Sequence, residues 1–224
     1  MRIKAIFVSI FFTFSNIAVG GEVFSSIPDE LGKANVKYIV YSHGRIVEGT
    51  NPRPVHPDWG IYDFPAVKEA LSEPDFTVIA LHRPAGIEAE EHSHKLVSLV
   101  KELISEGVKP EQITMVGFSQ GGYITALASN KLNSTPINTV ILATCWSWKD
   151  KETDVKLNGN VLSIYEVSDE VGSCNSLAKR SDGILSYKEI AINTGKDHGA
   201  FFTPRAQWVE PIKSWINSLP LKNE

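Results

Sequence analysis

Ser119 lies in the sequence GFSQG at positions 117–121, a G-x-S-x-G motif. The motif follows a short apolar run at 113–116 and precedes a segment rich in small residues at 121–128, so it lies between an expected strand and an expected helix. In that context the serine occupies a sharp, strained turn, and the two glycines let strand and helix approach each other. The turn exposes the hydroxyl and leaves the Gln120 N–H at a helix N-terminus, where it can stabilise an oxyanion. The alternative interpretation is a glycine-rich helix start capped by a serine.

A nucleophilic serine needs a base and an acid that orients the base. Among the six histidines, His198 follows the last expected strand and precedes the last expected helix, in a loop marked by neighbouring glycines. We predict that it is the base; the alternative is an ordinary surface-loop histidine. Asp169 is the first carboxylate after the preceding strand, and we predict that it is the acid, with Glu170 and Glu166 as rivals. The resulting chain order is Ser, Asp, His.

A second oxyanion donor is expected after the first strand. The apolar run 36–41 is followed by Ser42-His43-Gly44-Arg45, a turn whose useful group is a backbone N–H. We expect that donor to be Arg45, acting together with Gln120. We expect His43 to fix the turn rather than to serve as a second base.

The elements that must position these residues alternate between strands and helices. Six apolar runs are mostly continuous rather than alternating, which is typical of strands covered on both faces. They lie at 36–41, 76–81, 113–116, 139–144, 161–167 and 187–192, with helices expected at 66–71, 96–104, 121–128 and 208–219. This pattern predicts an α/β fold, a three-layer sandwich whose mostly parallel sheet has about six strands. In such a sheet, functional residues gather at the carboxyl ends of the strands.

Length and composition predict one globular domain over residues 21–224. The chain has 224 residues, 42% of them hydrophobic, and a formal net charge of −4 without a long run of either sign. This balance argues against a nucleic-acid partner, which calls for a clustered basic surface. Residues 1–20 combine a basic head, an apolar stretch and small residues near Gly20, which predicts a cleaved signal peptide. We therefore expect a secreted or periplasmic protein without a stable membrane anchor after cleavage.

Four motifs together resemble the α/β-hydrolase superfamily: SHGR at 42–45, GFSQGG at 117–122, SDEV at 168–171 and KDHG at 196–199. GFSQGG resembles the branch of small carboxylesterases, acyl-protein thioesterases and dienelactone-hydrolase-like proteins. The resemblance implies an eight-stranded parent fold trimmed at its first two strands. It also implies hydrolysis through an acyl-enzyme without a metal or cofactor. Arg45 stands where small or apolar residues are common in the thioesterases, and the dienelactone-hydrolase cysteine nucleophile is absent, so neither relative's substrate is carried over.

Export and the parent fold both bear on the two cysteines. In an oxidising compartment, Cys145 and Cys174 are the one intramolecular pair that the sequence allows. The parent fold implies that the strands ending at Thr144 and Val167 are neighbours, which brings both cysteines to the active-site end. We predict a disulfide that braces the acid loop.

These observations predict a hydrolase of carboxylic esters that acts on small or extended small-molecule substrates. The stretch 146–160 is short and polar, which argues against a cap domain. Thioesterase and peptidase activities, and a non-enzymatic binding protein with the same fold, are the alternatives. A metal site at Glu90, Glu91, His92 and His94 is disfavoured because residues two apart do not share a helix face. The aromatic residues that could line a substrate pocket are Trp59, Tyr62, Phe64, Trp146 and Trp148.

Overall fold

A seven-stranded sheet forms the centre of the protein. The computed structural model describes residues 21–29, 31, 36–135, 137–145 and 155–220; the predicted signal peptide, Trp146 and Trp148 lie outside them. All neighbouring strands of the sheet run parallel. In spatial order they are β1 (Val23–Phe24), β5 (Phe76–Ile79), β2 (Lys37–Ser42), β6 (Ile113–Phe118), β7 (Asn138–Leu142), β8 (Asn158–Glu166) and β9 (Gly183–Ile192).

The predicted α/β sandwich is confirmed, with two additions. All six expected strands are present, and the two-residue strand β1 adds a seventh at the edge next to β5. A separate antiparallel hairpin, β3 (Val55–His56) and β4 (Gly60–Ile61), lies outside the main sheet. In the part of the chain that the structure describes, no cap domain is inserted over the sheet.

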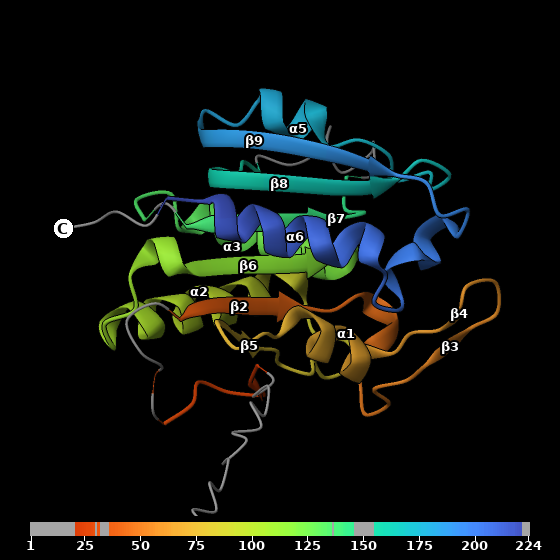
Figure 1. Cartoon of the computed structure of the whole chain (residues 1–224), viewed down its shortest axis with the longest axis horizontal. Coiled ribbons are helices and arrows are strands. Elements are labelled where there is room, and N and C mark those ends of the chain that lie inside the picture. The colour runs from red at the N-terminus through yellow and green to blue at the C-terminus, as the bar shows by residue number, and fades with distance from the viewer. Residues whose placement is uncertain (1–20, 30, 32–35, 136, 146–154, 221–224) are drawn as a thin grey trace, which may run out of the picture.

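Helices cover both faces of the sheet (Figure 1). Helices α1 (Phe64–Leu71) and α6 (Ala206–Ser218) pack on one face, and α2 (Ala89–Ser105) and α3 (Gln120–Lys131) on the other. A short helix, α5 (Asn175–Lys179), lies beside β9. No helix among the described residues combines the length and the apolar character needed to cross a bilayer.

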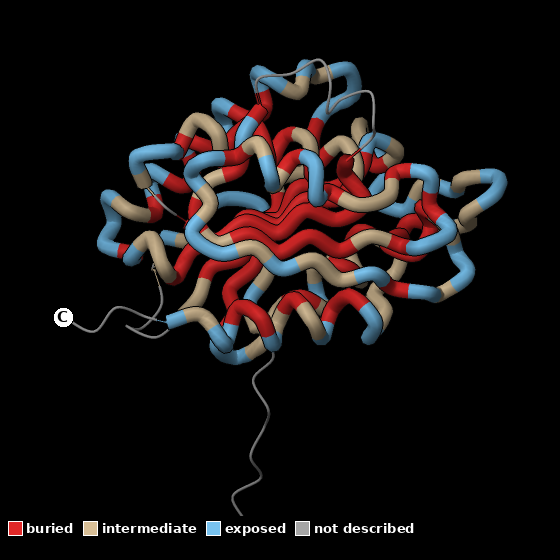
Figure 2. The backbone as a smooth tube through the Cα atoms, turned by 90° about the horizontal axis from the view of Figure 1, so that it is seen from above, coloured by how far each residue is buried: buried red, intermediate tan, exposed pale blue. Residues whose placement is uncertain are grey.

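Burial explains why the central strands are apolar along their whole length. Every residue of β5, β6 and β7 is buried, and side chains from both helical layers pack against them. Figure 2 shows this buried centre, with exposed residues at the periphery, in the turns, on the outer helix faces and along the edge strand β9. The result is a rigid sheet whose carboxyl edge carries Ser119 after β6, Asp169 after β8 and His198 after β9.

A buried carboxylate joins the loops that follow β8 and β9. Glu166, the last residue of β8, is fully buried and accepts hydrogen bonds from the Thr194 N–H and hydroxyl, both at 2.8 Å, and from the Ser168 hydroxyl at 3.2 Å. Ser168 in turn accepts a hydrogen bond from the Asp197 N–H. Burial raises the pKa of Glu166, but the hydrogen bonds from Thr194 and Ser168 outweigh it and leave the pKa below its usual value. The Glu166 carboxylate therefore holds the loop after β8, which carries Asp169, against the loop after β9, which carries His198.

We predict that Glu166→Gln lowers the free energy of unfolding by about 1.5–3 kcal/mol at pH 7, the usual range for hydrogen bonds to a charged group. Because the folded-state pKa of Glu166 is depressed, its contribution is complete above the unfolded-state value near pH 4.3 and is lost as the pH falls through the folded-state pKa. Chemical denaturation of both proteins at pH 7, 5 and 3.5 should therefore show the deficit of the variant shrinking at the lowest pH. A deficit that stays constant over this range would contradict the assignment.

Candidate active site

Ser119 sits in a strained turn between β6 and α3. Its φ of 53° and ψ of −118° lie in a region that side chains rarely adopt. The turn is possible because its glycines have no Cβ. A Cβ atom at position 117 would collide with the Gly121 carbonyl, and a Cβ atom at position 121 would collide with the carbonyl oxygens of Ser42 and His43. The Ser119 N–H donates to the Leu142 carbonyl at 2.9 Å, which fixes the turn against β7.

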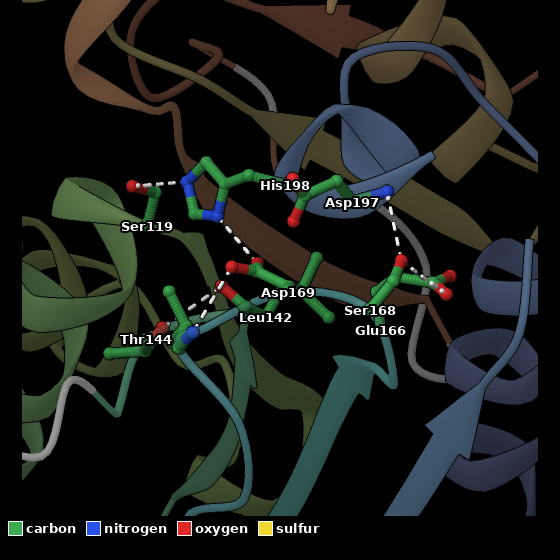
Figure 3. A network of polar contacts seen from close by, with 9 residues as sticks. Ser119, Leu142, Thr144, Glu166, Ser168, Asp169, Asp197 and His198 are labelled. Carbon is green, nitrogen blue, oxygen red and sulfur yellow. Dashed lines mark hydrogen bonds and ion pairs between the residues drawn. The ribbon is translucent and has the colours of Figure 1, made fainter. Parts of the chain in front are cut away.

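The structure brings Ser119, His198 and Asp169 together in one hydrogen-bonded chain (Figure 3). His198 Nδ1 lies 2.6 Å from Asp169 Oδ2, and His198 Nε2 lies 2.9 Å from Ser119 Oγ. Since a carboxylate only accepts hydrogen bonds, Nδ1 carries the proton and Nε2 accepts the hydrogen bond from the Ser119 hydroxyl. The imidazole is thus held in the tautomer that a general base requires.

The competing carboxylates point elsewhere. Glu170 is exposed, and the Glu166 carboxylate is occupied by Ser168 and Thr194. Asp169 is buried, and its second oxygen accepts the Val171 N–H at 3.1 Å, so both oxygens have defined partners. Of the three candidates from the sequence, the geometry favours Asp169 as the partner of the histidine.

The two expected oxyanion donors flank Ser119. Gln120 is the first residue of α3, so its N–H has no partner within the helix. Arg45 is the first residue of a short 3₁₀ helix, Arg45–Val47, and it lines the same cavity as Ser119 and Gly44. Arg45 is exposed, so its backbone N–H is the group of this residue that we consider as the second donor.

His43 fixes the turn that carries Arg45. Its Nε2 accepts the Arg83 N–H at 2.9 Å, so its Nδ1 carries the proton and donates to the Gly44 carbonyl at 2.8 Å. Burial, and then the positive charge of Arg83, lower the pKa of His43 to about 2. His43 is therefore neutral, with both nitrogens engaged by the backbone, and neither nitrogen is available as a base.

Arg83 is the residue of this site that sequence reasoning missed. Its side chain is fully buried; Nη1 donates to the Ser42 hydroxyl at 3.0 Å, and Nη2 donates to the His43 carbonyl. Its Nε lies 3.5 Å from a carboxylate oxygen of Glu48, and its carbonyl accepts the Gly49 N–H at 2.9 Å. Burial lowers the pKa of Arg83 and the Glu48 carboxylate counteracts this, while a guanidinium stays charged in either case.

Arg83 thus contacts both ends of the turn at 42–49, which we call the oxyanion turn. The only sequence signal was a single arginine after the strand at 76–81, because its partners lie at distant positions of the chain that no motif links to it.

An apolar cavity of about 330 Å³ opens beside Ser119. It is lined by Gly44, Arg45, Ile46, His56, Trp59, Phe118, Ser119, His198 and Phe202. Trp59 therefore lies where a substrate-pocket residue was expected. Tyr62 and Phe64 do not line it: both are buried in the core, and the Tyr62 hydroxyl pairs with that of Tyr41 at 2.6 Å.

The remaining candidate residues do not form a metal site. His92 is buried, whereas His94 is exposed and faces Glu90 at 3.6 Å. Among the described residues, no three His, Cys, Asp or Glu side chains are grouped so that they could hold a metal ion.

The two cysteines meet at the end of the sheet that carries the acid loop. The Cα atoms of Cys145 and Cys174 are 5.1 Å apart, within the range that a disulfide spans. The Glu189 carboxylate accepts the Cys174 N–H at 2.7 Å and the Ser173 hydroxyl at 2.6 Å, which fixes the loop that contains Cys174.

Comparison with known proteins agrees with this geometry. Residues 24–171 match the model of the Phospholipase/Carboxylesterase family. Among solved structures, SOBER1 of Arabidopsis thaliana is 15% identical with a TM-score of 0.54, covering 81% of this chain and 97% of that chain. Esterase PE8 is 19% identical with a TM-score of 0.56, covering 84% and 94%, and EstE5 is 11% identical with a TM-score of 0.59, covering 83% and 77%.

At these identities the solved structures support the fold alone, and a search of curated protein sequences found no match. The family match, by contrast, extends over more than half of the chain and includes the serine turn and the acid loop. This protein is therefore a hydrolase of the α/β fold and belongs to the phospholipase/carboxylesterase family.

Proposed function

We propose that this protein is a serine hydrolase that cleaves carboxylic esters through an acyl-enzyme. The observation that carries the proposal is the continuous hydrogen-bonded chain from Ser119 through His198 to Asp169, next to the N-terminus of α3. Ser119 Oγ attacks the ester carbon while His198 Nε2 takes its proton. The backbone N–H groups of Gln120 and Arg45 stabilise the tetrahedral oxyanion.

The alcohol then leaves with the proton from His198, and the acyl group remains on Ser119. A water molecule attacks this acyl-enzyme as His198 takes a proton from it, and the carboxylic acid departs when that proton returns to Ser119. Asp169 keeps Nδ1 protonated and stabilises the imidazolium that forms in each half-reaction. Only water is consumed, and the serine hydroxyl and the neutral imidazole are restored.

We further propose that the protein is exported and carries a disulfide between Cys145 and Cys174. The basic and apolar N-terminal segment supports export. The 5.1 Å separation of the two Cα atoms supports the bond, which an oxidising compartment would maintain. The bond would link the chain after β7 to the loop that follows Asp169.

We predict that a fluorophosphonate probe labels the wild-type protein once and does not label Ser119→Ala. The reason is that the probe reacts with a serine whose proton can pass to a base, and Ser119 has that base at 2.9 Å. Intact-mass spectrometry checks both proteins after their folding has been verified by circular dichroism. If the folded wild-type protein is not labelled, the alternative of a non-enzymatic binding protein is favoured. If it is labelled, a panel of ester, thioester and amide substrates separates the possible activities.

We predict that Arg83→Met lowers kcat for a small ester by about 10- to 100-fold and leaves KM nearly unchanged. Displacing an oxyanion donor weakens transition-state binding, and loss of a complete donor typically costs about 100- to 1,000-fold. Arg83→Lys should recover only part of the rate, since one ammonium cannot reach both Ser42 and His43 with the same geometry. Kinetics are measured well below the melting temperature of each variant, with Lys188→Met on the exposed part of β9 as control. A rise in KM at constant kcat would contradict this role.

We predict that the protein purified from an oxidising compartment shows no free thiol when denatured and two after reduction. Cys145 and Cys174 are the only cysteines in the sequence. Thiol titration in denaturant, with and without prior reduction, makes the measurement. Two thiols without reduction would rule the bond out.

A further inference from the structure

The hairpin β3–β4 forms one wall of the cavity beside Ser119. Trp59, in the turn between its strands, lies with its ring 5.1 Å from the His198 ring and 5.6 Å from the Phe202 ring. The His56 ring stacks on Trp59 at 4.0 Å with an angle of 14° between the planes. Trp59 therefore contacts the proposed base, and His56 packs behind Trp59.

The base of the hairpin is fastened to the same chain segment as His198. The Asp63 N–H donates to the Phe202 carbonyl at 2.9 Å, and the Tyr62 N–H donates to the Pro54 carbonyl at 2.9 Å. Arg53 closes the base through an ion pair of 3.0 Å with Asp63, which also caps α1. The wall is thus held at a defined distance from the proposed base.

A glycine brings the tryptophan this close. A Cβ at Gly199, the residue after His198, would lie 2.6 Å from Trp59 Cβ and 3.0 Å from its Cγ. The Trp59 side chain therefore packs directly on the backbone of the histidine loop, where only glycine leaves room for it.

The described lining of the cavity is mostly apolar. Among the described residues that line it, Ile46, Phe118, Phe202 and Trp59 are apolar or aromatic, none is a carboxylate, and Arg45 is exposed to solvent. Burying an uncompensated charge in such a lining is strongly unfavourable, whereas an apolar group gains from leaving water. The volume of about 330 Å³ lies at the small end for ligand sites and corresponds to about ten water-sized groups.

We infer that this cavity binds a small, uncharged, apolar group of the ester, and that Trp59 sets the length of group that fits. The inference rests on the proposed function. The apolar group belongs either to the acyl half or to the alcohol half of the ester, and the experiment distinguishes the two.

The test compares wild type with Trp59→Ala on two series of esters: methyl esters of straight-chain acids, and acetates of straight-chain alcohols, each followed by titration of the acid released. Wild type should favour short groups. Trp59→Ala should raise kcat/KM for long relative to short esters by about tenfold or more in one of the two series, because even one methylene in an apolar pocket is worth that much. The series that responds identifies the half of the ester that occupies the cavity.

Ile61→Ala is the matched control, since Ile61 lies on the same hairpin, is exposed and does not line the cavity. Its length profile should equal that of wild type. Ile46→Trp provides the opposite change: it adds bulk to the cavity from the oxyanion turn, so it should lower kcat/KM for the longer esters relative to methyl acetate by about tenfold or more. This second variant keeps the test decisive where Trp59→Ala does not fold.

Unchanged length profiles in both series, for folded variants that still react with a small fluorophosphonate, would overturn the inference and leave the proposed function intact. A folded wild-type protein that neither reacts with the probe nor cleaves any ester would instead overturn the proposed function.

Discussion

Helix α3 approaches strands β2 and β6 so closely that side chains are excluded from the contact, and the site depends on that approach. Gly121 lies against the carbonyl oxygens of Ser42 and His43, and Gly117 lies against Gly121. The chain between them can turn only by placing Ser119 at a φ of 53°, a conformation that costs about 1–3 kcal/mol. The neighbouring buried strands β2 and β7 contact the turn on both sides and hold it in this conformation. The same contact places the start of α3 beside the oxyanion turn, so the proposed nucleophile and both proposed oxyanion donors share one rigid junction.

Two buried charges extend this rigidity to loops that the sheet itself cannot hold. Beyond the last ladder hydrogen bond, the backbone groups of a loop need other partners. Arg83 supplies donors to the oxyanion turn, and Glu166 supplies acceptors to the loops that carry Asp169 and His198. A buried charge is tolerated only when it is well hydrogen-bonded, so each charge favours the one loop arrangement that satisfies it. Backbone N–H groups that are held in place before the reaction are the main source of oxyanion stabilisation in hydrolytic sites. Arg83 contributes to this by holding the turn that carries the Arg45 N–H.

The sequence predicted those parts of the molecule whose physics is local. Continuous apolar runs identified six strands because both faces of the sheet are covered, and the glycines around Ser119 reported a close approach. Strand β1 and the hairpin were missed, since two-residue strands have too few residues to show a period. The choice between Asp169 and Glu170 depended on which carboxylate the loop turns inward, and that is decided by the Val171 N–H and by Glu166 rather than by residue type. Arg83 escaped notice because its partners Ser42 and His43 lie about forty positions earlier in the chain.

The proposed catalytic residues and the proposed selectivity residue of this site are positioned by different segments of the fold, the main sheet and the hairpin β3–β4. The family match ends at residue 171, so His198 lies beyond it. Its position follows instead from the long pairing of β8 with β9, which runs from Asn158 to Glu166, and from the hydrogen bonds of Glu166 to Thr194 at the end of that pairing. The hairpin between the oxyanion turn and α1 takes no part in that pairing, because β3 and β4 pair with each other and not with the main sheet. Its side chains can therefore change without altering the strands that carry the serine, the histidine and the acid. Trp59 belongs to this hairpin and packs on Gly199, the residue that follows the proposed base. A substitution of Trp59 would therefore alter which ester fits the cavity, while the hydrogen-bonded chain from Ser119 to Asp169 keeps its geometry.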